Sequence, residues 1–203
     1  MVTRRQVLAS VALFTSRTAA AEEEGLRRIA ERRRKIKTMR ASFRQTRVIG
    51  LLASEVKSTG WLTVVSPARL RWDLRPPDDV TYWIGPEGIA MRSEGEVVRV
   101  PKRAAGRFAA VLSDLLILLG GDLRRLEARY RIETKLRGEH LSLRAQPRTD
   151  DVKKHVASLR FEANGLSPAL VEIVEPKGDR SLIRFEAVKL NVEVDPKTMR
   201  PPT

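Results

Sequence analysis

The sequence predicts a mainly β protein with a few helices, built on one antiparallel sheet of about eleven strands. Three observations lead to this fold class. Between Thr46 and Val100, and again between Tyr130 and Val188, apolar residues alternate with polar ones, as in strands that bury one face. The predicted strands are joined by short turns, which connect antiparallel but not parallel neighbours. Between the two runs, from Arg107, the apolar spacing changes to that of a helix.

The stretch on either side of Pro67 shows the alternation most clearly. Pro67 ends one strand, because proline removes a backbone donor. In the next strand, Trp72 follows Arg69 and Arg71 in strict alternation. We expect the apolar members to face a dry, concave side of the sheet, and Arg69, Arg71 and Arg75 to face water. A dry face that carries Trp72 needs a cover, which is either a packed layer or a lid over a cavity.

The apolar segment between the two runs predicts a helix that is either wholly buried or covers an apolar surface that moves. Residues 115–119 carry no charge, and Gly120-Gly121 ends the helix. Asp122 then caps a second short helix that starts at Leu123. The position of this segment between two runs of sheet suits an inserted lid.

A further helix is predicted from Glu22 to about Arg44, because apolar residues recur there at steps of three and four and the first turn is acidic. The opposite side is crowded with arginine and lysine. Such a run is found in nucleic-acid-binding proteins, but an exported protein meets no nucleic acid. A solvated helix face is the simpler interpretation, and transient contact with an anionic membrane surface or an acidic partner is the alternative.

The amino terminus has the pattern of an export signal over residues 1–21. Arg4 and Arg5 precede a short apolar run and an A-x-A cleavage pattern that ends at Ala21. The apolar run is too short to span a bilayer. The paired arginines fit a twin-arginine signal; an ordinary secretory signal that happens to hold two arginines is the alternative. We expect residues 22–203 to form one exported domain, with a loose, proline-rich tail after Asp195.

The sequence predicts no enzyme, no metal site and no cofactor. The chain has no cysteine, which removes disulfides, zinc–thiolate sites and cysteine nucleophiles. His140 and His155 have no carboxylate at ligand spacing. Ser54 and Lys57 match a Ser/Lys nucleophile pair in letters only, since a strand places them on opposite faces. The pair Asp150-Asp151 is interpreted as a turn.

The residue pattern by itself leaves two possibilities open: the apolar side chains fill a core, or they line a cavity for a lipid. Phe43, Gln45, Gly60, Pro67 and Trp72 carry a resemblance to the outer-membrane lipoprotein carrier family, the LolA-like periplasmic chaperones. The resemblance extends over nearly all of the expected mature chain. It implies a strongly curved, half-open antiparallel barrel with the amino-terminal and inserted helices lying in its mouth.

The resemblance also implies a function in the periplasm. It suggests a carrier, expected to be monomeric, that takes the acyl chains of lipoproteins from an inner-membrane exporter to an outer-membrane acceptor. An apolar residue set is expected to line the cavity: Phe43, Leu62, Val64, Leu70, Trp72, Tyr82, Ile84, Leu112, Leu115, Leu116, Leu143, Phe161, Ile173 and Phe185.

One position departs from the family pattern. Members carry an arginine before the proline of the hairpin, which holds the lid closed, whereas this chain has Ser66 there. Arg69 and Arg71 are expected to face outward and so do not replace it. Two alternatives therefore stay open: a shuttle for another lipid or glycolipid on the same fold, and a non-enzymatic interaction module with a filled core and a basic surface.

Overall fold

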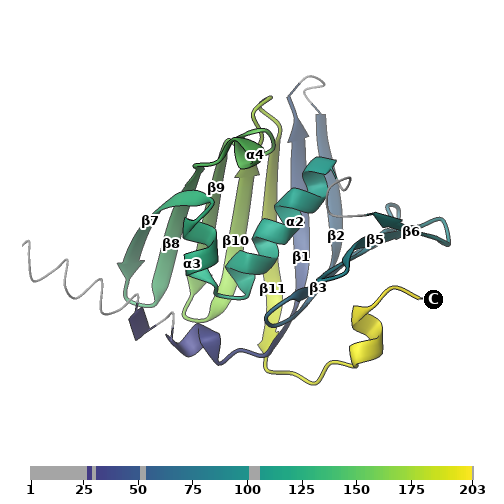
Figure 1. The fold of residues 1–203 in the computed structure, drawn as a ribbon, viewed down its shortest axis with the longest axis horizontal. Coiled ribbons are helices and arrows are strands. Elements are labelled where there is room, and N and C mark those ends of the chain that lie inside the picture. Colours follow the sequence, from purple (N-terminus) through teal and green to yellow (C-terminus); the bar gives the residue numbers. More distant parts are fainter. Residues whose placement is uncertain (1–26, 29–30, 51–53, 101–105, 203) are drawn as a thin grey trace, which may run out of the picture.

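A computed structural model describes residues 27–28, 31–50, 54–100 and 106–202. It contains one sheet of eleven strands with helices on one of its faces (Figure 1). The strands are β1 Thr38–Ile49, β2 Ser54–Val65, β3 Arg69–Leu74, β4 Thr81–Gly85, β5 Gly88–Ser93, β6 Glu96–Val100, β7 Tyr130–Arg137, β8 His140–Pro147, β9 Ser158–Asn164, β10 Ser167–Val174 and β11 Arg180–Leu190. The helices are α2 Gly106–Leu119, α3 Leu123–Glu127, α4 Asp150–Lys153 and the 3-10 helix η1 Pro196–Met199. The predicted export signal lies outside the described residues.

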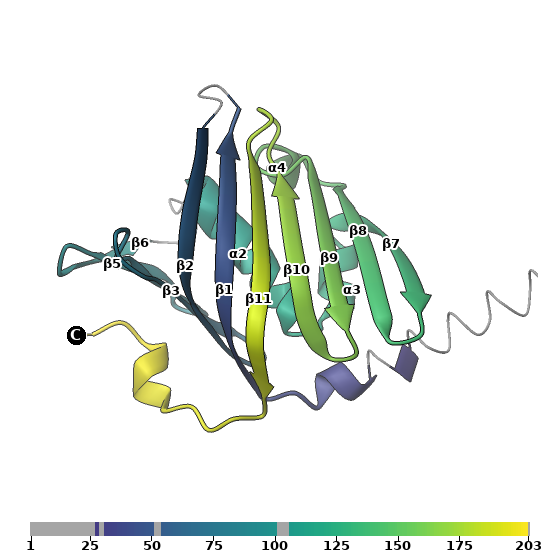
Figure 2. The ribbon, with the colours of Figure 1, turned by 180° about the vertical axis from the view of Figure 1, so that it is seen from behind.

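The sheet is antiparallel throughout and follows the order β6-β5-β4-β3-β2-β1-β11-β10-β9-β8-β7. The two halves of the chain therefore meet where β1 pairs with β11, and β6 and β7 form the two ends of an open sheet. The sheet curves around α2 and α3, which lie on its inner side; the view from behind shows strands in front of both helices (Figures 1 and 2). The predicted fold class is confirmed.

The predicted helix from Glu22 to Arg44 is wrong in its second half. Residues 31–34 are helical, but β1 begins at Thr38 and carries Phe43 in its middle. Apolar residues 39 and 43 fit a helical spacing, yet Met39, Ala41 and Phe43 also alternate at the period of a strand. Pairing with both β2 and β11 decides between the two, because β1 is hydrogen-bonded along both edges.

The core lies on the inner face of the sheet. Phe43 packs on Trp72 with ring centroids 4.0 Å apart, an aromatic contact that adds to the burial of both rings. Gly60 pairs with Phe43 across the β1–β2 ladder, and a Cβ at Gly60 would lie 1.9 Å from the Asp73 carbonyl oxygen and 2.6 Å from Phe43 Cζ. A side chain at position 60 would therefore disturb both the backbone of β3 and the packing of Phe43 on Trp72.

Two further predictions are corrected by the structure. The segment after Asp195 is not loose: it forms η1, and Met199 is buried. Asp150-Asp151 does not form a turn but opens the one-turn helix α4, which buries Val152. Each of these short helices buries one apolar side chain, and a lone apolar residue has no periodicity from which a helix is predicted. No helix among the described residues is long and apolar enough to cross a membrane.

Candidate functional site

The inner face of the sheet and the helix above it form one apolar layer. Helix α2 is apolar on most sides, and its side chains at positions 112, 115, 118 and 119 are all buried against the strands. Thirteen of the fourteen residues predicted to line a cavity belong to this buried cluster. Tyr82 is half-buried and packs against the cluster from β4. The sequence thus correctly placed these residues on one face; whether they bind lipid stays a prediction.

The arginines of β3 lie on the opposite, outer face. Leu70 and Trp72 are fully buried in the core cluster. Arg71 instead forms an ion pair with Asp73 at 2.8 Å, and Arg69 pairs with Glu87. The predicted alternation across β3 is therefore confirmed.

Helix α2 is attached to β7 by a carboxylate that the sequence prediction missed. Asp114 is buried and accepts hydrogen bonds from Arg129 Nε at 2.8 Å and from the Tyr130 hydroxyl at 2.5 Å. Arg129 also contacts Asp151 of α4 at 3.3 Å. A buried carboxylate is stable only when it is paired in this way. The sequence indicates this attachment only through Asp114 itself, a single acidic residue in an otherwise apolar helix.

A second polar attachment holds the carboxyl end of α2. Arg33 is buried, and its guanidinium donates to the carbonyl oxygens of Leu118 at 3.3 Å and Leu166 at 3.4 Å. The guanidinium also lies 5.1 Å from the centre of the Phe161 ring. Burial lowers the pKa of Arg33 from its ordinary value to about 10. In the sequence, Arg33 looks like an interruption of the apolar helix face; the structure shows that it belongs to the core.

Replacing Tyr130 with phenylalanine is expected to remove part of the protein's sensitivity to alkali. Burial, with a smaller contribution from Asp114, raises the pKa of the Tyr130 hydroxyl above its ordinary value of 10. The folded chain therefore keeps this proton while the unfolded chain loses it above about pH 10, so stability falls as pH rises through that range. Urea midpoints measured between pH 7 and pH 11 should fall less steeply in Tyr130→Phe than in the unmodified protein.

Tyr82→Phe is the comparison variant, because Tyr82 is the chain's other tyrosine and is only half-buried. Burial and Asp78 raise the pKa of Tyr82 as well, so Tyr82→Phe should also make the pH curve less steep, but by less than Tyr130→Phe. At pH 7, Tyr130→Phe should itself cost about 1–3 kcal/mol, the loss of a hydrogen bond to a charged group. Parallel pH curves for the unmodified protein and Tyr130→Phe would contradict the assignment.

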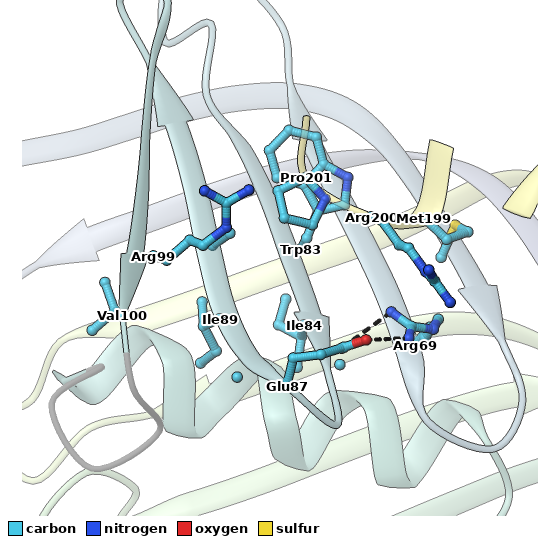
Figure 3. Close-up of a pocket in the computed structure, with 13 residues that line it drawn as sticks. Arg69, Trp83, Ile84, Glu87, Ile89, Arg99, Val100, Met199, Arg200 and Pro201 are labelled. Atoms are coloured by element: carbon cyan, nitrogen blue, oxygen red, sulfur yellow. Dashed lines mark hydrogen bonds and ion pairs between the residues drawn. The ribbon is translucent and has the colours of Figure 1, made fainter. Parts of the chain in front are cut away.

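A pocket of about 420 Å³ lies away from the predicted cavity, between the outer face of β4–β6 and the carboxyl-terminal segment (Figure 3). Of the fourteen predicted site residues, only Ile84 borders it. Its charged residues are Arg69, Glu87, Arg99 and Arg200, and Trp83 and Pro201 lie among them. No sequence pattern indicated this pocket, because the tail that closes it was expected to be loose.

Among the described residues, no cluster of three or more His, Asp or Glu side chains is placed to hold a metal ion. The fold and the inner face together define a class of protein: a curved, open sheet that keeps an apolar surface under a helix. The sequence profile described as "Outer membrane lipoprotein carrier protein LolA" matches residues 34–201, and the chain belongs to this family.

Two relatives carry the name of this family, and a solved structure has a similar fold. The chain is 24% identical over 189 residues to an outer-membrane lipoprotein carrier protein of Pseudomonas fluorescens strain Pf0-1, covering 93% of this chain and 89% of the relative. The protein of the same name from Pseudomonas putida strain KT2440 is 23% identical over 190 residues, with 94% and 89% covered. An uncharacterized conserved protein from Thermus thermophilus has a similar fold, with a TM-score of 0.50 at 10% identity, covering 89% of this chain and 94% of that one.

Proposed function

We propose that this protein is a periplasmic carrier that binds the acyl chains of lipoproteins on the inner face of its sheet and transfers them from the inner to the outer membrane. Family membership and the lipoprotein-carrier relatives support this function. The observation that carries it is the continuous apolar layer formed by α2 and the strands below it. Each methylene moved from water into such a layer contributes about 0.8 kcal/mol, so an acyl chain needs no specific chemistry to bind there.

Binding requires α2 to move, since its side chains cover the face that the acyl chains would use. The polar attachments that this movement must break include the bonds of Asp114 to Arg129 and Tyr130 and the bond of Arg33 to the carboxyl end of the helix. We infer that α2 acts as a lid, that the carrier works as a monomer and without catalysis, and that its partners are an inner-membrane exporter and an outer-membrane acceptor.

One observation favours a second function. All the predicted lining residues pack together in the structure, as they would in an interaction module with a filled core. A shuttle for another lipid or glycolipid shares the apolar layer and differs only in its cargo.

Mass spectrometry of material that copurifies with the protein from the native periplasm tests the proposal. We expect acylated lipoprotein to be bound. Free lipid or glycolipid without lipoprotein would favour the other shuttle, and the absence of any acylated molecule after crosslinking would favour the interaction module. Protein stripped of lipid with detergent and returned to the same extract provides the control for losses during purification.

A further inference from the structure

The outer face of β1–β6 carries a row of cross-strand neighbours that runs from the centre of the sheet to its edge. The strand register places them side by side in the order Arg40, Thr63, Arg71, Trp83, Ala90 and Arg99. Neighbours in such a row lie about 5 Å apart. The row therefore brings three arginines and a tryptophan together, although Thr63, Trp83 and Ala90 within it are buried.

The carboxyl-terminal segment crosses this row and is bound to it through its backbone. Arg71 Nη1 and Trp83 Nε1 both donate to the Thr198 carbonyl, at 3.1 and 3.0 Å. Arg99 Nη2 donates to the Pro202 carbonyl at 2.7 Å. These bonds, together with the burial of Met199, fix the segment as one wall of the pocket.

The pocket combines an apolar floor with an excess of positive charge (Figure 3). Three guanidinium groups, from Arg69, Arg99 and Arg200, and one carboxylate, from Glu87, line the pocket. Arg69 is already paired with that carboxylate. Arg200 is close enough to the same carboxylate to lower its pKa, but among the described residues its guanidinium forms no hydrogen bond to another side chain. The pocket thus has a net charge of +2, from three arginines and one glutamate, and the guanidinium fork of Arg200 keeps its hydrogen-bond donors for an anion.

The next row of the same face carries a second cationic and aromatic group. Trp61 lies between two guanidinium groups, with Arg40 at 5.4 Å and Arg75 at 5.3 Å from its ring. Neither arginine forms an ion pair within the described part of the chain. Trp61 pairs with Asp73, which binds Arg71 of the first row, so the two groups are adjacent. Tryptophan and arginine together are typical of surfaces that meet the headgroups of a bilayer.

We propose that the pocket binds the phosphate of an anionic phospholipid headgroup, and that the outer face of β1–β6 thereby docks on an anionic bilayer. The free fork of Arg200 suits a phosphate, which guanidinium binds in a bidentate manner. A volume of about 420 Å³ fits a headgroup and leaves the acyl chains in the bilayer. An extended acidic peptide is less suited to this face, because the carboxyl-terminal segment already accepts the hydrogen bonds that the side chains of Arg71 and Arg99 donate. This proposal concerns a surface other than the inner face and does not depend on the identity of the cargo.

Vesicle cosedimentation at one fixed salt concentration tests the proposal. Vesicles of phosphatidylcholine alone are compared with vesicles that also contain phosphatidylglycerol. We expect binding only to the anionic vesicles, and an affinity lower by about fivefold for Arg200→Gln, the effect of one charge near the surface. Arg200 and Glu87 are both exposed, so water screens the attraction between them, and this change should alter the urea midpoint very little. Adding Arg99→Gln should weaken binding further.

Arg131→Gln with Arg137→Gln is the matched control, since both residues are exposed on β7 at the other end of the sheet. Equal weakening in this control would overturn the proposal, because binding would then follow net charge. No binding to the anionic vesicles would overturn it too. So would Arg200-dependent binding of inorganic phosphate alone, or of a polyglutamate peptide alone, which would indicate a free anion or an acidic protein partner. If no lipoprotein copurifies with the protein, the proposed cargo is wrong, but the vesicle experiment still decides whether the outer face binds an anionic bilayer.

Discussion

Replacing Leu116 with aspartate is expected to abolish the binding of an apolar fluorescent probe while lowering the urea midpoint only modestly. Leu116 is buried between α2 and the sheet. A carboxylate held there without a partner would cost several kcal/mol, a large fraction of a domain's stability. If α2 is a lid, it can lift and let water reach the aspartate, so most of that cost disappears when the site is empty. The cost returns when an acyl chain or a probe must share the space.

Leu143→Asp is the matched control for this experiment. Leu143 belongs to the same buried cluster but lies on β8, which is paired on both sides and cannot lift. The urea midpoint should fall less than half as far in Leu116→Asp as in Leu143→Asp. A similar collapse of both variants would show that α2 is a fixed part of the core, and would favour the interaction module over the carrier.

The sheet could be predicted because its signal is local and repeated. The alternation around Trp72 fixes both the strand and its buried face, and turns such as Asn164-Gly165 separate consecutive strands. The same alternation predicts that Arg71 lies on the outer face, where it forms an ion pair with Asp73. The predicted lining residues came together for this reason, since each one occupies the apolar phase of a strand or a helix.

What could not be predicted depends on contacts between distant segments. Residues 38–44 fit a helix or a strand equally well, and pairing with β2 and β11 decides. The pocket exists because Thr198 lies over Arg71 and Trp83, more than a hundred positions away in sequence. In the sequence, Arg33 interrupts an apolar helix face, and only its contact with α2 shows that it is a core residue. No periodicity reports such contacts.

We infer that Arg33 supplies the guanidinium that the resemblance leads us to expect at position 66. That position holds Ser66, and Arg69 and Arg71 both face outward. The structure nevertheless places a guanidinium at the carboxyl end of α2, where a cation is favoured by the helix dipole and by free carbonyl groups. Its second bond, to Leu166, joins α2 to the turn between β9 and β10. We therefore expect Arg33 to hold the lid closed.

Replacing Arg33 with methionine should release α2 with little change in global stability. Methionine keeps the apolar stem and fills the space beside Phe161, but it removes both hydrogen bonds to α2 and the β9–β10 turn. Among the described residues, Arg33 has no carboxylate partner, so burying its charge costs free energy in the folded state. The substitution removes this cost, which opposes the loss of the two hydrogen bonds. The two effects on the free energy of unfolding therefore offset one another, whereas the attachment of α2 to Arg33 is lost.

Hydrogen exchange followed by mass spectrometry checks this prediction. Amides in the carboxyl half of α2 should exchange about tenfold faster in Arg33→Met, the effect of losing one hydrogen bond to a charged group of about 1.5 kcal/mol. The same variant should bind the apolar probe more tightly, because less free energy is needed to open the lid. Arg34→Met is the control, since Arg34 is exposed and makes no contact with α2 among those the structure describes. Unchanged exchange in α2 combined with a lower urea midpoint would show instead that Arg33 stabilises the whole fold and does not control the lid.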